Sequence, residues 1–304
     1  MYAWSILEPP TPPGFRRLRL AQSWGWQHLL AGGDGPPLFL IHGLGGSHRD
    51  FLSLLPRLGQ HFTCLAPDLP GFGLSAKPNA SYSTDFFCQS LVELAEALGV
   101  ARADWAGHSM GGQIVLWLAA SRPERVGRVA AICPAGGHTA PEGVQRTLLW
   151  LLTYDDRFRF FHPRLLDLGL SHVFGQPYLG PDIWPGMAEI RSYNQAFWDT
   201  PQRPLLERAL IRSAKGVLAH SLLGKLDGLA SPVLLVEGQG DRVIPPRQTA
   251  ALWEALPPGT QRVSLPGGHM PPYLEPERLA EVLLAFLRAE VDTVRPGGHT
   301  TSNP

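Results

Sequence analysis

A serine flanked by glycines lies in the segment GHSMG at residues 107–111. It follows an apolar run at 103–106 that predicts a strand, and it precedes an apolar stretch at 113–120 that predicts a helix. A serine on such a sharp strand-to-helix turn needs neighbours without bulk, and the turn presents its hydroxyl to solvent. The pattern therefore predicts Ser109 as a nucleophile. It also places the backbone N–H of Met110 at a helix start, where it can stabilise negative charge on a reacting oxygen.

A serine hydroxyl is a weak nucleophile and needs a general base. Of the 11 histidines, His269 stands out because it lies on a glycine-rich loop between the last predicted strand and the last predicted helix. Asp241 follows the apolar run Val233–Glu237 through Gly-Gln-Gly, and Glu237 is a rival carboxylate. Reactive groups gather on loops at the carboxyl ends of parallel strands. We therefore predict that Asp241 orients His269 and that His269 activates Ser109.

A second glycine-rich loop, HGLGG at residues 42–46, follows an apolar run at 37–41. The backbone N–H of Leu44 is the natural second donor to an oxyanion, beside that of Met110. A phosphate cradle is the rival interpretation. However, the loop lacks G-x-G-x-x-G, and the chain contains no G-x-x-x-x-G-K-[ST]. We expect an oxyanion hole here and neither a cofactor nor a metal.

The elements that would position these residues alternate along the chain. Near-continuous apolar runs predict buried strands, as a parallel sheet covered on both faces requires. Helical patterns lie between them: Ser83 or Thr84 begins one helix that Gly99 ends, and Pro276 begins the last. The alternation predicts a mostly parallel, doubly wound α/β sheet. Its predicted strands lie at 37–43, 62–67, 103–109, 126–133 and 233–237, with a weaker last strand at 261–265.

One stretch breaks this alternation. Residues 137–226 show no convincing strand pattern, are rich in aromatic side chains and are too many for a loop. We predict that they form a helical cap, inserted before the last two strands. The α/β core would then comprise residues 14–136 and 227–291. The Pro-rich residues 1–13 and the polar residues 292–304 would be irregular or disordered termini.

Composition excludes several classes of protein. Lys plus Arg and Asp plus Glu are 26 each among 304 residues, so the formal net charge is zero, which argues against a nucleic-acid partner. The three cysteines lie far apart with no CxxC pair, so they predict neither a disulfide framework nor a zinc site. No signal peptide is recognisable, and no apolar run reaches 18 residues, so no membrane span is expected. We expect a cytoplasmic protein acting on a small molecule, with its oligomeric state open.

Taken together, the motifs resemble the α/β-hydrolase superfamily, and in particular its capped serine hydrolases. HGLGG, the DLPGFGLS run at 68–75, GHSMGG, the G-x-x-D around Asp241 and GGHM follow in the family's order and span residues 37–290. The resemblance implies an α/β-hydrolase fold, the predicted triad and no cofactor. It also implies a cap inserted after the strand that ends near Cys133, and a chiefly structural 68–75 loop.

The resemblance also separates this chain from some relatives. Dehalogenases and epoxide hydrolases of the fold use an aspartate nucleophile where this chain has Ser109, and dehalogenases favour Trp where it has Met110. Hydroxynitrile lyases of the fold use a lysine of the cap. Here Lys215 and Lys225 lie only at or near the end of the predicted cap, which argues against a lyase. Carbon–carbon hydrolases of ring-cleavage diketones share SMGG, but they usually have Asn where this chain has His108.

We therefore expect a serine hydrolase that cleaves a carboxylic ester, thioester or lactone through an acyl-enzyme on Ser109. Two alternatives stay open: a carbon–carbon bond hydrolase of ring-cleavage diketones, and a ligand-binding receptor on a hydrolase scaffold. The aromatic stretch suggests an apolar pocket, with Trp184, Phe197, Trp198 and Met270 as candidate walls. The three aromatic residues could equally pack the core of the cap itself.

Overall fold

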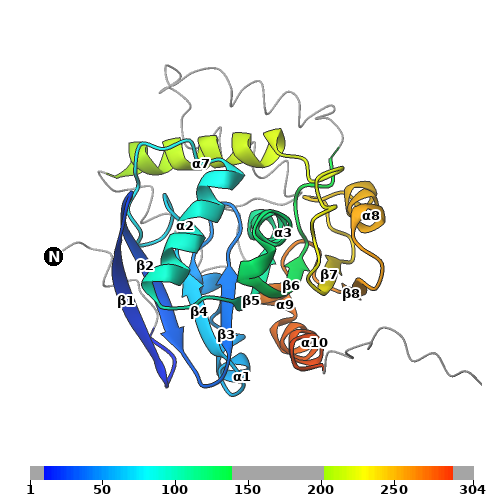
Figure 1. The fold of residues 1–304 in the computed structure, drawn as a ribbon, viewed down its shortest axis with the longest axis horizontal. Coiled ribbons are helices and arrows are strands. Elements are labelled where there is room, and N and C mark those ends of the chain that lie inside the picture. The colour runs from blue at the N-terminus through cyan, green and yellow to red at the C-terminus, as the bar shows by residue number, and fades with distance from the viewer. Residues whose placement is uncertain (1–9, 139–201, 290–304) are drawn as a thin grey trace, which may run out of the picture.

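The computed structural model describes residues 10–138 and 202–289. Within these residues the strands form one eight-stranded sheet in the order β1-β2-β4-β3-β5-β6-β7-β8 (Figure 1). The strands are β1 (Phe15–Gln22), β2 (Gly25–Gly32), β3 (Pro37–Ile41), β4 (Thr63–Pro67), β5 (Ala103–His108), β6 (Val126–Ile132), β7 (Val233–Gly238) and β8 (Gln261–Leu265). The longer helices are α2 (Thr84–Ala97), α3 (Met110–Ser121), α7 (Arg203–Ala219), α8 (Pro246–Ala255) and α10 (Pro276–Arg288). Short helical turns are η2 (His48–Phe51), α1 (Leu55–Leu58), η3 (Pro123–Arg125) and α9 (Pro271–Leu274).

The sheet is mostly parallel, as the sequence predicts. Strands β4, β3, β5, β6, β7 and β8 pair in parallel, whereas β2 runs antiparallel to both of its neighbours, β1 and β4. The β1–β2 hairpin is an addition that the sequence analysis did not predict. In β1, the half-buried Leu18 and Leu20 alternate with the exposed Arg17 and Arg19. This period of two is typical of a strand with one solvent-facing side, whereas the strands of the parallel part of the sheet have nearly continuous apolar runs.

Two apolar layers enclose the sheet, because successive side chains of a strand point to opposite faces. In β3, Phe39 and Ile41 belong to the core cluster shared with α2 and α3. Leu38 and Leu40 belong to the opposite cluster, which includes residues of α1 and α10. All four are fully buried. Figure 1 shows α2 and α3 on one side of the sheet and α10 on the other, which is the doubly wound arrangement.

The helix boundaries follow local capping chemistry. The hydroxyl of Ser83 accepts a hydrogen bond from the backbone N–H of Phe86, so Ser83 is the N-cap of α2. Gly99, at φ +70°, follows the last turn, where a left-handed backbone favours glycine. Helix α10 begins at Pro276, as predicted. Its buried residues Leu279, Leu283, Phe286 and Leu287 recur at helical spacing.

The segment between β6 and β7 contains the predicted cap. Residues 139–201 lie outside the described residues, so the boundaries 137–226 and the predicted termini stay predictions. The described part of the segment includes α7, which lies across the top of the sheet in Figure 1. Gln113 of α3 donates a 3.0 Å hydrogen bond to the carbonyl oxygen of Val217, which ties α7 to the helix that follows Ser109.

Candidate active site

Ser109 lies on a strained turn between β5 and α3. Its backbone adopts φ 54° and ψ −115°, a region that L-residues rarely occupy. A Cβ on Gly107 would overlap the carbonyl of Gly111, and a Cβ on Gly111 would overlap the carbonyl of Ile41 at the end of β3. The two glycines of the motif are therefore required by close backbone approach, as the sequence argument anticipates. The turn presents the Ser109 hydroxyl at the carboxyl edge of the sheet.

The three predicted triad residues meet in one hydrogen-bonded chain. His269 Nε2 lies 2.9 Å from Ser109 Oγ, and His269 Nδ1 lies 2.8 Å from Asp241 Oδ2. The carboxylate can only accept, so the Nδ1–H of His269 donates to it and the bare Nε2 faces the serine hydroxyl. The His269 and Asp241 side chains are each 7% exposed, which strengthens the pairing by excluding water.

Asp241 is held by the turn that carries it. Its second oxygen, Oδ1, accepts the backbone N–H groups of Val243 at 2.8 Å and Ile244 at 2.9 Å. This leaves Oδ2 to face His269. The rival carboxylate, Glu237, instead forms a 2.8 Å ion pair with Arg262 on the neighbouring strand. The geometry thus brings Asp241, and not Glu237, to the base.

Close backbone packing joins the loop of Asp241 to the loop of His269. A Cβ on Gly238, at the end of β7, would overlap the carbonyl of Gly268, which precedes His269. The backbone N–H of Gln239 donates a 2.7 Å hydrogen bond to the carbonyl of Leu265, the last residue of β8. The parallel pairing of β7 with β8 therefore fixes where Asp241 and His269 lie relative to each other.

The HGLGG loop lies directly beside the serine. A Cβ on Gly43 would lie 3.2 Å from Ser109 Cβ, which is a tight contact, so the backbone of the loop packs closely against the serine. A 3.1 Å hydrogen bond from Gly46 N–H to the Gly43 carbonyl closes the turn around Leu44. Met110 is the first residue of α3 and is buried. Both predicted oxyanion donors therefore belong to backbone segments that adjoin Ser109.

The His42 side chain holds the HGLGG loop in place through two hydrogen bonds. Its Nδ1 lies 2.7 Å from the Gly43 carbonyl, and its Nε2 accepts a 2.9 Å hydrogen bond from the backbone N–H of Leu69. A carbonyl can only accept, so the Nδ1 carries the proton and the ring is neutral. Burial lowers the pKa of His42, in agreement with that neutral state. A neutral His42 thus links β3 to the loop after β4.

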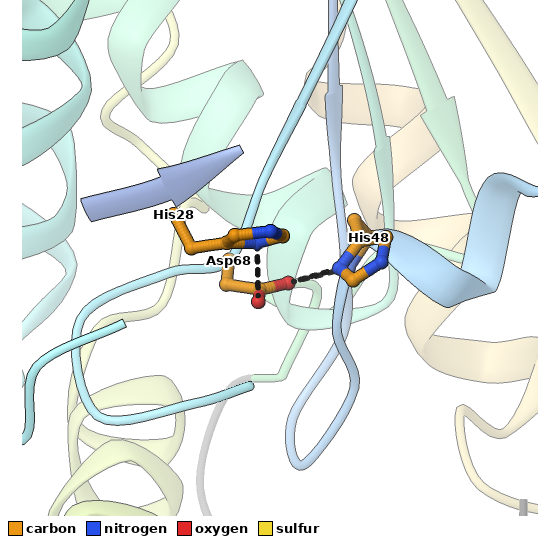
Figure 2. A group of neighbouring side chains, drawn as sticks. All are labelled: His28, His48 and Asp68. Atoms are coloured by element: carbon orange, nitrogen blue, oxygen red, sulfur yellow. Dashed lines mark hydrogen bonds and ion pairs between the residues drawn. The ribbon is translucent and has the colours of Figure 1, made fainter. Parts of the chain in front are cut away.

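Asp68 organises a buried cluster next to the site, shown in Figure 2. Its carboxylate accepts from the ring Nδ1 of His28 at 3.0 Å and of His48 at 2.9 Å. It also accepts from the backbone N–H groups of His48 and Leu74, at 2.7 and 2.8 Å. Burial alone would raise the pKa of Asp68, but the two histidines outweigh burial and hold that pKa well below its usual range. The carboxylate is therefore an ionised, four-fold hydrogen-bonded clamp.

Within residues 10–138 and 202–289, two groups of side chains have the composition of a metal site. The ligand atoms of His28, His48 and Asp68 lie within 4.8 Å of one another, as do those of Cys133, Asp241 and His269. In both groups the imidazole Nδ1–H that would face a metal already donates to the carboxylate. A metal would have to displace these protons and break those hydrogen bonds. Hydrogen bonding among the residues accounts for both clusters without a cation.

Of the four residues predicted to line a pocket, only Met270 lies within the described residues. Met270 follows the base at the start of α9 and is half-buried, and its N–H donates a 3.1 Å hydrogen bond to the Gly267 carbonyl. Trp184, Phe197 and Trp198 lie outside the described residues. In the described part of the cap segment, Leu210 of α7 reaches the glycine loop, since its Cδ1 would lie 3.6 Å from a Cβ on Gly45.

A family model for the alpha/beta hydrolase fold matches residues 36–276. The chain belongs to the alpha/beta hydrolase family. The predicted fold and family are thereby confirmed, and the match covers the glycine loop, the serine turn and the loops of Asp241 and His269.

Individual relatives cover most of the chain. A Rhodobacter capsulatus protein named magnesium-chelatase 30 kDa subunit is 31% identical over 259 residues, which are 84% of this chain and 87% of that protein. A pimeloyl-[acyl-carrier protein] methyl ester esterase from Vibrio vulnificus is 27% identical over 262 residues, which are 85% of this chain and 97% of the esterase. The solved structure of a bacterial membrane phospholipase A aligns with a TM-score of 0.72 at 28% identity, covering 90% of this chain and 86% of that one. The family is thus one of hydrolases with esterases among its members.

In residues 10–138 and 202–289, none of the helices has the length and apolar character needed to cross a bilayer.

Proposed function

We propose that this protein is a serine hydrolase that cleaves a carboxylic ester, thioester or lactone of a small, apolar molecule. The observation that carries the proposal is the unbroken hydrogen-bonded chain from Ser109 Oγ through His269 to Asp241, with distances of 2.9 and 2.8 Å. Such a chain is the means by which a weak hydroxyl nucleophile is activated. The esterase relative from Vibrio vulnificus supports ester chemistry.

In the proposed reaction, His269 Nε2 takes the proton of Ser109 as the Oγ attacks the substrate carbonyl carbon. The tetrahedral intermediate collapses, the proton on His269 passes to the leaving group, and an acyl-enzyme remains on Ser109. Water then attacks the acyl carbon with His269 again as base, and the acid product leaves. Asp241 stays ionised and stabilises the imidazolium that forms twice in the cycle.

The backbone N–H groups of Leu44 and Met110 are proposed to hold the oxyanion. Both belong to segments that adjoin Ser109, and Met110 adds the favourable field of a helix N-terminus. Loss of one such donor typically costs about 3–4 kcal/mol of transition-state stabilisation. Substrate would enter below the cap, where Leu210 of α7 lies near the glycine loop. Met270, together with Trp184, Phe197 and Trp198 of the cap, is proposed to line the acyl pocket.

The decisive experiment compares wild type with Ser109→Ala, using p-nitrophenyl esters from acetate to decanoate and a fluorophosphonate label. Ser121→Ala is a matched control, because Ser121 lies at the far end of the same helix and its hydroxyl donates to the Trp117 carbonyl. We expect wild type and Ser121→Ala to label and turn over, and Ser109→Ala to do neither. The chain length with the highest kcat/KM would then give the size of the pocket.

Two other results would redirect the assignment. If wild type labels but hydrolyses no ester, Ser109 is activated and carbon–carbon bond hydrolysis of a diketone becomes the candidate reaction. If wild type neither labels nor hydrolyses, the hydrolase proposal fails and a binding role replaces it. The name of the 31% identical relative, a subunit of a chelatase, would then point to a role in an assembly.

A further inference from the structure

His108, the residue before Ser109, contacts the backbone of His269, whereas Ser109 contacts its side chain. His108 Nε2 lies 2.7 Å from the backbone carbonyl oxygen of His269, and the two imidazole rings lie 5.0 Å apart between centroids. Ser109 meets the side chain of the same histidine at 2.9 Å. Two consecutive residues of the serine turn therefore hold His269 at its backbone and at its side chain.

The geometry fixes the protonation state of His108. A carbonyl oxygen only accepts, so Nε2 must carry a proton. Among the described residues His108 Nδ1 has no hydrogen-bond partner, and the side chain is almost fully buried. A proton on Nδ1 would be a buried donor without an acceptor, which costs free energy. An unprotonated Nδ1 in a neutral ring costs less. His108 is therefore the neutral Nε2–H tautomer.

The groups that face His108 explain why its neutrality matters. They are His269 and Asp241 on the acid–base loops and His42 below the glycine loop. Burial, followed by the neighbouring His269, lowers the pKa of His108 to about 3. A charged ring at this distance would oppose the positive charge that His269 acquires when it takes the serine proton. The neutral ring donates to the backbone without that repulsion.

His108 also borders the proposed oxyanion loop. A Cβ on Gly43 would lie 3.3 Å from His108 Nδ1 and 3.2 Å from Ser109 Cβ. The imidazole thus fills the space between the glycine loop and the loop of the base. A smaller side chain at residue 108 would leave both loops without a common support.

We infer that His108 is a positioning residue whose neutral imidazole fixes the backbone of the base relative to the nucleophile. This inference rests on the proposed function. A displacement of the base on the order of 1 Å can reduce a rate about 100-fold. The role differs from that of the triad, because His108 neither accepts the serine proton nor contacts substrate in the proposed reaction.

Three substitutions separate this role from simple packing. His108→Gln keeps a neutral N–H donor that can reach the His269 carbonyl, whereas His108→Leu removes the donor, and His108→Asn carries an amide too short to reach. His138→Leu is a matched control, because the buried His138 also contacts a backbone carbonyl through Nε2, that of Leu218 at 2.8 Å. If His108→Leu does not fold, His108→Asn supplies the same comparison.

The first measurement is the second-order rate of fluorophosphonate labelling between pH 5 and 9. We expect a 10- to 100-fold loss in His108→Leu and His108→Asn, with kcat for esters reduced and KM nearly unchanged. Labelling by His108→Gln should stay within about threefold of wild type, since the hydrogen bond is retained. His138→Leu should lose stability without losing labelling rate. A loss below threefold in both His108→Leu and His108→Asn would overturn the inference.

The second measurement needs no substrate, so it also decides the case in which the proposed function fails. In ¹⁵N-histidine NMR spectra, His108 should show the Nε2–H tautomer and should not titrate between pH 5 and 9. The low-field Nδ1 proton resonance of His269 should change in His108→Leu and be preserved in His108→Gln. A titrating or Nδ1-protonated His108, or a His269 spectrum unaffected by His108→Leu, would refute the role.

Discussion

The phenol of Tyr273 donates a 2.5 Å hydrogen bond to Oδ1 of Asp50. Asp50 lies on η2, just after the HGLGG loop, and Tyr273 lies on α9, just after His269. This bond therefore connects the loop proposed to hold the oxyanion to the loop that carries the base. A Cβ on Gly46 would overlap the Asp50 carboxylate, so the contact also explains the last glycine of HGLGG.

Tyr273→Phe should destabilise the protein by about 1–3 kcal/mol, because a buried carboxyl group loses a donor. Burial raises the pKa of Asp50, so the folded protein binds the proton of the Asp50 carboxyl group more tightly than the unfolded chain does. Protonation of Asp50 therefore stabilises the folded protein at low pH, and this stabilisation is lost as the pH rises. The Tyr273 hydroxyl opposes that loss because it binds the carboxylate. Its removal should therefore cost more at pH 8 than at pH 4 in urea denaturation.

Tyr82→Phe is the control for this measurement. The Tyr82 hydroxyl donates a 2.7 Å hydrogen bond to the Pro78 carbonyl, which does not titrate. Burial raises the pKa of Tyr82 to about 12, above the range of the experiment. Its substitution should have the same cost at both pH values. Equal costs at pH 4 and pH 8 for Tyr273→Phe would contradict the role assigned to Asp50.

Asp241→Asn should leave the fold intact and reduce kcat for esters by as much as about 10⁴-fold. The amide can donate to His269 Nδ1 and so stabilise the wrong tautomer, which leaves no bare Nε2 to accept the serine proton. Glu237→Gln is the control, since Glu237 pairs with Arg262 on the sheet edge. Comparable losses in the two variants would argue that Asp241 is not the orienting carboxylate.

Gly111→Ala should be destabilising, or prevent folding, because the added methyl group would overlap the carbonyl of Ile41. Overpacking of this kind typically costs about 1–3 kcal/mol or more. Gly99→Ala serves for comparison: Gly99 has φ +70° but no atom within 4 Å of its Cβ position, so only backbone strain is added. Chemical denaturation of both variants tests the prediction, which an unchanged stability of Gly111→Ala would disprove.

Asp68→Asn should destabilise the protein at pH 7 by about 3–5 kcal/mol, because two buried imidazoles lose an ionised partner. The pKa of Asp68 is lower in the folded protein than in the unfolded chain. Its stabilising contribution is therefore present above the unfolded value of about 3.9 and is lost as the pH falls through the acid range. In the acid range, the free energy of unfolding of Asp68→Asn should therefore fall less steeply with decreasing pH than that of the wild type. The exposed Asp227→Asn should change neither the stability at pH 7 nor its dependence on pH in the acid range. An unchanged pH dependence in Asp68→Asn would contradict the role assigned to the Asp68 carboxylate.

Much of the fold was predictable because its signals are local. The six apolar runs correspond to β3 through β8, and the glycines of GHSMG fall where backbone atoms leave no room for a side chain. The proximity of Ser109, Asp241 and His269 could be predicted because each follows a predicted strand, and parallel strands end at a common edge. The β1–β2 hairpin was missed because β1 exposes Arg17 and Arg19 on one side and so lacks a continuous apolar run.

The supporting contacts of the site could not be predicted in the same way. His28 and Asp68 are 40 residues apart, and Asp50 and Tyr273 are 223 residues apart. No periodicity marks such pairs, and only the completed sheet brings them together. For His108 a signal was available: as the residue next to the nucleophile at the end of a buried strand, its side chain had to meet something polar.

Ser109 and His269 are separated by 160 residues, and β8, which leads to the base, is the last strand and an edge of the sheet. A chain that emerges from the ribosome therefore contains its proposed nucleophile long before it contains its proposed base. Contacts of such high sequence separation form slowly and late. In the proposed function, the hydroxyl of Ser109 therefore stays chemically ordinary during synthesis, and it becomes reactive only when the chain has finished folding.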